Sequence, residues 1–159
     1  MYIQLCCAGK IKERYWRDAL SEYEKRLLRY HSLDIIEITD EPDPPHQSEE
    51  ARLALLLKEA ERFEKKINPK AFLIALDVQG QTLSSEAFAH KLNHLEAQGL
   101  THLCFLIGSS HGLHPELLKK ANMRLSISAM TLPHQLCRVF FLEQLYRAAR
   151  INTGAPYHK

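Results

Sequence analysis

The chain has 159 residues, of which 45% are hydrophobic and 25% charged, and its formal net charge at pH 7 is +2. These values are typical of one globular domain and exclude a disordered chain, so we expect a single domain over residues 1–159. No apolar run approaches the roughly 18 residues of a membrane helix, and the N-terminus "MYIQLCCAGK" does not have the pattern of a signal peptide. We therefore expect a cytoplasmic protein without a membrane partner.

The first half of the chain alternates between strand and helix patterns. Residues 1–9 and 33–39 are predicted strands, and residues 12–30 are a predicted helix with Trp16, Leu20, Tyr23 and Leu27 on one face. A loop with three prolines follows the second strand. Ser48 is then expected to cap a helix that runs to about Ile67.

The second half continues the alternation. Residues 71–77 form a continuous apolar run typical of a strand buried on both faces, and residues 78–84 are a predicted turn. Further strands are expected at 101–108 and 124–129, and further helices at 85–99 and 114–121. Leu132 or Pro133 opens the last and most hydrophobic helix.

This order predicts an α/β fold: a mostly parallel sheet of five or six strands with helices on both faces. Ligands bind such sheets at the carboxyl ends of the strands. The rule selects three loops, at residues 76–80, 108–112 and 127–132. The strands before them are the most apolar, so we expect them to be central.

Charge and cysteine usage add two expectations. From Lys119 onward the chain has seven basic residues and one acidic residue, which favours a polyanionic partner, although a solvated face without a partner stays open. The four cysteines have no metal-binding or redox spacing and are expected to be buried free thiols.

The segment "GSSHG" at 108–112 matches the G-x-S-x-G pattern of a serine hydrolase, with Ser110 as nucleophile and Glu143 and His158 following in the order of that class. The short chain and the position of Glu143 within a helix argue against this alternative. The competing interpretation is an apolar slot formed by Leu76, Gly108 and the segment "ISAMTL". Such a slot suits an adenosine-type cofactor without phosphates, since no phosphate-binding motif is present. S-adenosylmethionine is the common cofactor of that kind.

A set of short motifs spans the whole chain: "AGK" with "YW", "EYEKRL", "IALDVQG", "FLIGSSHGL", "LSISAMTLPHQLCRV", "EQLYRA" and the terminal "PYHK". With these motifs the sequence resembles, from end to end, the RlmH family of SPOUT-class methyltransferases. Members of that family methylate nitrogen 3 of a pseudouridine in bacterial large-subunit ribosomal RNA.

The resemblance implies a single SPOUT domain with a C-terminal trefoil knot, in which the chain after Ile127 passes through an earlier loop. It implies a homodimer whose active sites are each completed by the partner chain. It also implies that S-adenosylmethionine is held by residues at eight positions: Leu76, Gly108, Ile127, Ser128, Ala129, Met130, Thr131 and Leu132.

For catalysis we predict His158, Tyr157 and Arg138, with His158 as a general base and Tyr157 stacking on the target base; His134 is a second candidate base. Arg138, Arg147, Arg150 and Lys159 are expected to bind RNA phosphates. His111 and His114 resemble a metal pair only in spacing, and we expect no metal.

One departure from the family stands at Ser109, where a glycine is usual. Serine would be strained there if the backbone needed a positive φ. A non-catalytic RNA-binding module remains a third possibility. The sequence leaves open whether the partner is free ribosomal RNA, the large subunit or the assembled ribosome.

Overall fold

The computed structural model describes residues 1–156 and is built on one five-stranded sheet. Its strands are β1 (Tyr2–Ala8), β2 (Ser32–Ile38), β3 (Phe72–Thr82), β4 (His102–Ile107) and β5 (Met123–Ser126). They lie in the order β2-β1-β4-β3-β5, and every neighbouring pair is parallel. The predicted parallel α/β class is confirmed, with five strands.

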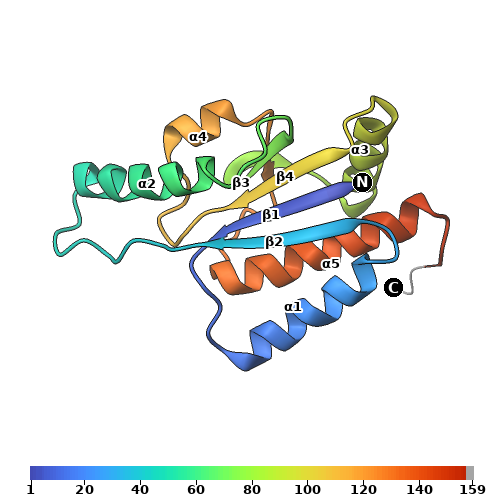
Figure 1. Cartoon of the computed structure of the whole chain (residues 1–159), viewed down its shortest axis with the longest axis horizontal. Coiled ribbons are helices and arrows are strands. Elements are labelled where there is room, and N and C mark those ends of the chain that lie inside the picture. The colour runs from blue at the N-terminus through green and yellow to red at the C-terminus, as the bar shows by residue number, and fades with distance from the viewer. Residues whose placement is uncertain (157–159) are drawn as a thin grey trace.

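Helices cover both faces of the sheet (Figure 1). The helices α1 (Arg14–Leu27), α3 (Ser85–Ala97) and α5 (His134–Asn152) pack on one face, and α2 (Glu49–Glu64) and α4 (Pro115–Lys120) on the other. Successive side chains of a strand point to opposite faces. In β1, Ile3 and Leu5 therefore join the first core and Cys6 joins the second. Burial on both faces explains the continuous apolar runs.

Several helix boundaries follow the local chemistry that the sequence indicates. The Ser48 hydroxyl accepts a hydrogen bond from the Ala51 N–H at 3.1 Å and caps α2. Gly99 follows the end of α3 with φ of +79°, a conformation that glycine adopts without strain. On α1, Leu20 and Leu27 are buried, as the spacing of its apolar residues predicts.

The prediction of a turn at residues 78–84 was wrong for residues 78–82, which belong to a strand. β3 continues to Thr82, and its pairing with β5 shifts register between Leu76 and Gln81, so that the residues between them are left out of the ladder. Gly80 allows this close approach, because a Cβ there would lie 2.7 Å from backbone atoms of Arg124 and Leu125. Such close packing of two backbones is compatible with a knotted topology, and the trefoil knot itself stays a prediction.

The expectation that the three most apolar strands are central was wrong for β5. β5 pairs only with β3 and lies at an edge, whereas β1 lies inside the sheet between β2 and β4. An apolar run indicates that helices cover both faces of a strand. It does not indicate whether the strand pairs with another strand at each of its edges.

The cysteines are free thiols, as expected. Cys6, Cys7 and Cys104 are buried and Cys137 is half-buried. Burial raises the pKa of the Cys7 thiol to about 12, which keeps it protonated and inert. Within residues 1–156, no helix combines the length and apolar character needed to cross a bilayer.

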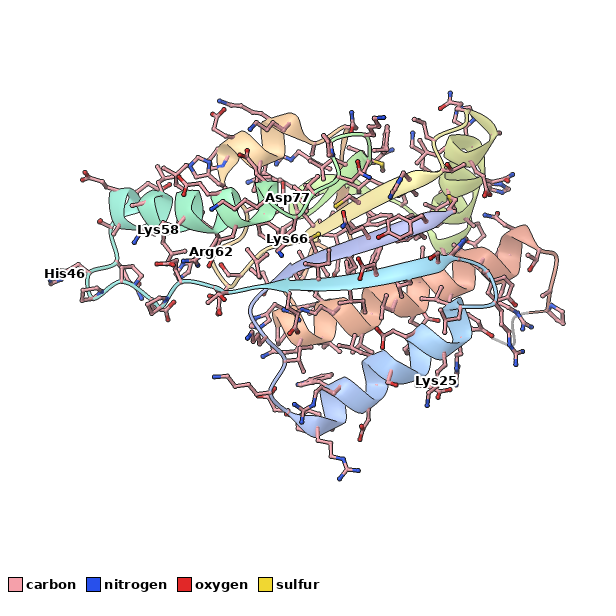
Figure 2. The ribbon with its side chains drawn as sticks, viewed as in Figure 1. Lys25, His46, Lys58, Arg62, Lys66 and Asp77 are labelled. Carbon is pink, nitrogen blue, oxygen red and sulfur yellow. The ribbon has the colours of Figure 1, made fainter. Side chains whose placement is uncertain are left out.

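A fully buried arginine ties α5 to the sheet. Most charged side chains point outward, as Lys58 on α2 and Lys25 on α1 do in Figure 2, but Arg138 is 0% exposed. Its guanidinium donates to Glu37 Oε1 at 2.7 Å and to the carbonyl oxygens of Ala8 and Gly9, both at 2.7 Å. Arg138 therefore fixes the first turns of α5 against the carboxyl ends of β1 and β2.

We expect Arg138→Met to lower the free energy of unfolding by about 3–5 kcal/mol, because it removes the cation that pairs with the Glu37 carboxylate and the donor to two carbonyl oxygens. Urea denaturation measures this loss. Arg14→Ala is the matched control, since Arg14 and Asp18 form an ion pair with side chains 89% and 69% exposed. It should cost less than about 1 kcal/mol. Equal stability of the two variants would contradict the anchoring role.

Candidate functional site

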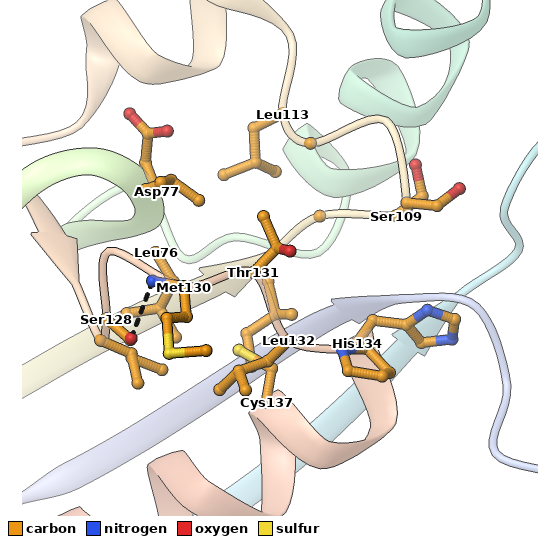
Figure 3. Close-up of a pocket in the computed structure, with 17 residues that line it drawn as sticks. Leu76, Asp77, Ser109, Leu113, Ser128, Met130, Thr131, Leu132, His134 and Cys137 are labelled. Atoms are coloured by element: carbon orange, nitrogen blue, oxygen red, sulfur yellow. Dashed lines mark hydrogen bonds between the residues drawn. The ribbon is translucent and has the colours of Figure 1, made fainter.

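The main cavity of the described chain, about 590 Å³, lies where the ladder between β3 and β4 ends, at Leu76 and Ile107 (Figure 3). All three loops selected from the sequence line it. Of the predicted cofactor residues, Leu76, Gly108, Ile127, Ser128, Met130, Thr131 and Leu132 line the cavity. Ala129 is exposed and is not among the lining residues. The apolar loop after β5 is thus the wall of this cavity.

The lining is apolar and carries little charge. Its apolar surface comes from Leu76, Ile107, Leu113 and Leu132. No lysine or arginine of the described chain lines the cavity. Its one carboxylate, Asp77, is bound by the guanidinium of Arg124, with an Nε–Oδ2 distance of 2.8 Å. Such a cavity suits a largely apolar ligand and provides no cationic side chain for a phosphate.

The second wall is a tight turn at residues 108–112. The Gly112 N–H donates to the Ser109 carbonyl at 2.9 Å, and Gly112 has φ of +87°. A Cβ at Gly108 would lie 2.2 Å from the Gly112 carbonyl oxygen. We expected Gly108 to leave room for the ligand; the structure shows that it first leaves room for the turn itself.

Ser109 is compatible with this turn. No non-glycine residue within 1–156 has a positive φ, so serine in place of the family's glycine carries no backbone strain. The Ser109 hydroxyl donates to Glu59 Oε2 at 2.9 Å, and the other oxygen of Glu59 accepts from the Glu41 N–H at 2.9 Å. The two hydrogen bonds lower the pKa of the Glu59 carboxyl, but burial raises it by more, so the pKa lies above its usual value.

The sequence analysis missed Glu59, which fastens the turn to α2. A signal was present: Glu59 is 1% exposed and falls between Leu55 and Phe63 on the buried stripe of α2. A carboxylate on such a stripe requires partners inside the protein. Ile107, Leu113 and Cys137 were not predicted from the sequence either, because they contact the cavity only through tertiary packing.

The start of α5 closes the cavity with His134 and Cys137. Partial burial and the neighbouring Arg138 cation lower the pKa of His134, while Asp40 and Glu13 act in the opposite direction. Burial raises the pKa of the Cys137 thiol to about 11. At neutral pH the site therefore holds a neutral imidazole and a neutral thiol.

The structure does not provide the geometry of a serine hydrolase. Ser110 is exposed, has no positive φ and makes no hydrogen bond within residues 1–156, whereas a nucleophile elbow is strained and pairs its serine with a base. Glu143 forms an ion pair with Arg147 on α5. His158 lies outside the described residues.

Among the predicted RNA-binding residues that lie within 1–156, Arg138 differs in environment from Arg147 and Arg150. Arg138 is buried, so its expected contacts with phosphate and substrate do not fit its position. Arg147 pairs with Glu143 at 2.7 Å, and Arg150 contacts the Tyr146 hydroxyl and donates to the Pro156 carbonyl. Tyr157, His158 and Lys159 lie outside the described residues.

The two histidines with metal-like spacing have other partners. His111 Nε2 lies 2.7 Å from Asp43 Oδ1, and His114 Nδ1 caps α4 by accepting from the Glu116 N–H at 3.2 Å. Across residues 1–156, no group of three potential metal ligands occurs.

A family model described as "Predicted SPOUT methyltransferase" matches residues 1–158. The chain belongs to the SPOUT methyltransferase family. The expected family is thereby confirmed, and its methyltransferases use S-adenosylmethionine as methyl donor.

Two relatives match this SPOUT chain from end to end. Both are named "Ribosomal RNA large subunit methyltransferase H" and align over 159 residues that cover 100% of each chain. The protein of Bifidobacterium adolescentis is 50% identical and that of Streptococcus equi subsp. zooepidemicus is 44% identical. Among solved structures, a probable methylase family protein from Haemophilus influenzae aligns with a TM-score of 0.56 and 15% identity, covering 99% of this chain and 70% of that chain. That likeness supports the fold alone.

We expect His134 to titrate below the pKa of about 6.5 of a histidine in an unfolded peptide, measured by NMR of the imidazole resonances. Because its folded pKa is depressed, protonation favours the unfolded chain, and stability falls as pH drops from about 6.5 through the folded value. His134→Gln should flatten this dependence below about pH 6.5. A His134 midpoint at or above the peptide value would contradict the assignment.

Proposed function

We propose that this SPOUT protein transfers the methyl group of S-adenosylmethionine to nitrogen 3 of a pseudouridine in large-subunit ribosomal RNA. The observation that carries the proposal is the apolar cavity at the strand ends, in a chain 50% identical over its full length to a ribosomal RNA methyltransferase. The proposal covers three forms of the substrate: free ribosomal RNA, the large subunit and the assembled ribosome. We place the enzyme in the cytoplasm because its substrate is ribosomal RNA.

The cavity suits the proposed cofactor in both shape and charge. S-adenosylmethionine supplies a methyl group on a positively charged sulfur and has no phosphate. Leu76, Ile127 and Leu132 offer apolar surface for the adenine ring. The turn at residues 108–112 brings backbone close to the cavity, where main-chain groups can recognise the edge of the ring. The remaining predicted contacts come from the loop at 127–132.

Methyl transfer to nitrogen 3 also requires a base that removes a proton. Nitrogen 3 carries a proton in the free base, which must leave for methyl transfer to occur. His134 lines the cavity and is held neutral by partial burial beside Arg138, so it is able to accept one. His158 is the alternative base. Holding the two reactants in line provides the rest of the acceleration.

We expect Gly108→Ala to weaken S-adenosylmethionine binding at least about tenfold while circular dichroism stays near wild type. The added Cβ meets the Gly112 carbonyl oxygen and displaces the turn that forms one wall. Isothermal titration calorimetry measures the affinity. Ser110→Ala in the same turn removes an exposed hydroxyl, adds no atoms, and should retain most of the affinity. Unchanged binding by Gly108→Ala would exclude this turn from the cofactor site.

We infer that the active site is completed in a homodimer, and the length of α5 supports this. His134 at its start lines the cavity, whereas Arg150, bonded to Pro156, lies about 24 Å further along the helix. The three residues after Pro156 span at most about 10 Å. If Tyr157 and His158 act on substrate, they therefore act at another copy's cavity.

Exposed apolar side chains near the cavity support the same inference. Met130 is 78% exposed and Val78 is 53% exposed, both at the cavity rim. Phe140 is 38% exposed and lines a second cavity of about 220 Å³, which shares Ile127 with the first. A second copy of the chain is the occupant that would cover these side chains.

The composite site predicts complementation between two impaired variants, assayed at an S-adenosylmethionine concentration well below the weakened affinity of Gly108→Ala. One carries Gly108→Ala, and the other lacks Tyr157–Lys159. Co-expressed with different tags and purified through both, they form a heterodimer in which one site combines an intact cavity with an intact tail. Its methyl transfer to a ribosomal RNA fragment should reach about half of wild type. Failure of the two tags to co-purify would contradict the dimer, and an inactive heterodimer would contradict the shared site.

A further inference from the structure

A third cavity, of about 260 Å³ and lined by polar side chains, lies between α1 and α5 and shares no residue with the proposed cofactor site. Its walls carry four cationic side chains, Lys25, Arg26, Arg29 and Arg150, against one carboxylate, Glu22. Glu22, Lys25, Arg26 and Arg29 follow the i, i+3, i+4, i+7 spacing of one face of α1 and its continuation, which gathers their charges beside α5. The cavity therefore carries a strong positive excess.

Part of this charge has no partner in the protein. Arg26 is paired with Glu22 at 2.8 Å, but Lys25 and Arg29 are exposed and form no ion pair within residues 1–156. The Nε of Arg150 is buried without a hydrogen-bond partner in the same part of the chain. A buried donor of this kind requires an acceptor, which a bound anion would supply.

Two tyrosines hold the cavity in shape. The ring of Tyr146 lies 5.8 Å from the Arg26 guanidinium and 6.0 Å from that of Arg150, within the range of cation–π attraction. Tyr30 packs edge-on against Tyr146, with ring centres 6.0 Å apart. The two guanidinium groups are thereby held in place at the cavity before any ligand binds.

We propose that this cavity binds backbone phosphates of the RNA substrate that flank the nucleotide to be methylated. The inference rests on the proposed function. It places RNA here because Arg150 is bonded to Pro156, the residue directly before the predicted substrate-binding tail. Several separate cations around an open cavity suit a chain of phosphates, each contributing to affinity through neutralised charge.

The test uses the full-length protein and a ribosomal RNA fragment containing the target pseudouridine. For Lys25→Ala/Arg29→Ala, we expect RNA affinity, measured by fluorescence anisotropy, to fall about tenfold or more at 0.1 M salt. The slope of log affinity against log salt should decrease by about 1.4 units, because two phosphate contacts to single-stranded RNA are lost. Saturating RNA should restore the single-turnover methylation rate, and affinity for S-adenosylmethionine should not change.

Lys65→Ala/Lys70→Ala is the matched control. It removes the same charge from two exposed lysines outside the cavity that form no ion pair in the described chain. An equal loss of affinity in both double variants would reduce the effect to general charge and overturn the site, as would unchanged affinity in the cavity variant. Failure of the proposed function itself is distinguishable, because the wild-type protein would then not methylate the target pseudouridine at any RNA concentration.

Discussion

The buried guanidinium of Arg138 determines where the last helix lies. Its hydrogen bonds to Glu37 and to the carbonyls of Ala8 and Gly9 join α5 to two strands that precede it by about a hundred residues or more. Removing such a charge from water is unfavourable unless its partners are well placed. The network therefore favours the placement of α5 in which these hydrogen bonds form, and this placement brings His134, one turn earlier, to the wall of the cavity.

The cavity depends on backbone geometry as much as on side chains. Gly80 lets β3 and β5 approach closely, Gly108 lets the turn at 108–112 fold back, and neither position tolerates a Cβ without movement. Glu59 then fastens that turn to α2 through Ser109. These contacts hold the turn at 108–112 in place before ligand arrives, which reduces the ordering cost of binding.

α5 connects two regions of different chemistry. Its first turn closes an apolar cavity suited to a small cofactor, and its last turns, with α1, surround a cationic cavity suited to phosphates. Because these ends are more than 20 Å apart, about the length of the helix between them, one copy does not bring both to the same nucleotide. A dimer that places the end of one α5 beside the start of the other would unite them, which links the proposed homodimer to the proposed RNA contacts.

The sequence by itself determined the class of fold, the three loops at the strand ends and, through its resemblance, the family. These features depend on periodicity, local caps and short motifs, which act over a few residues. Only the tertiary structure decided that β5 lies at an edge, that β3 continues past Leu76, and that Arg138 is an internal anchor instead of a surface contact. It alone revealed Glu59 as the support of the turn, and brought Lys25 and Arg29 beside Arg150. The reason is physical: burial, ion pairing and backbone approach depend on segments far apart in the chain, and the pattern of any one segment does not record which partner it meets.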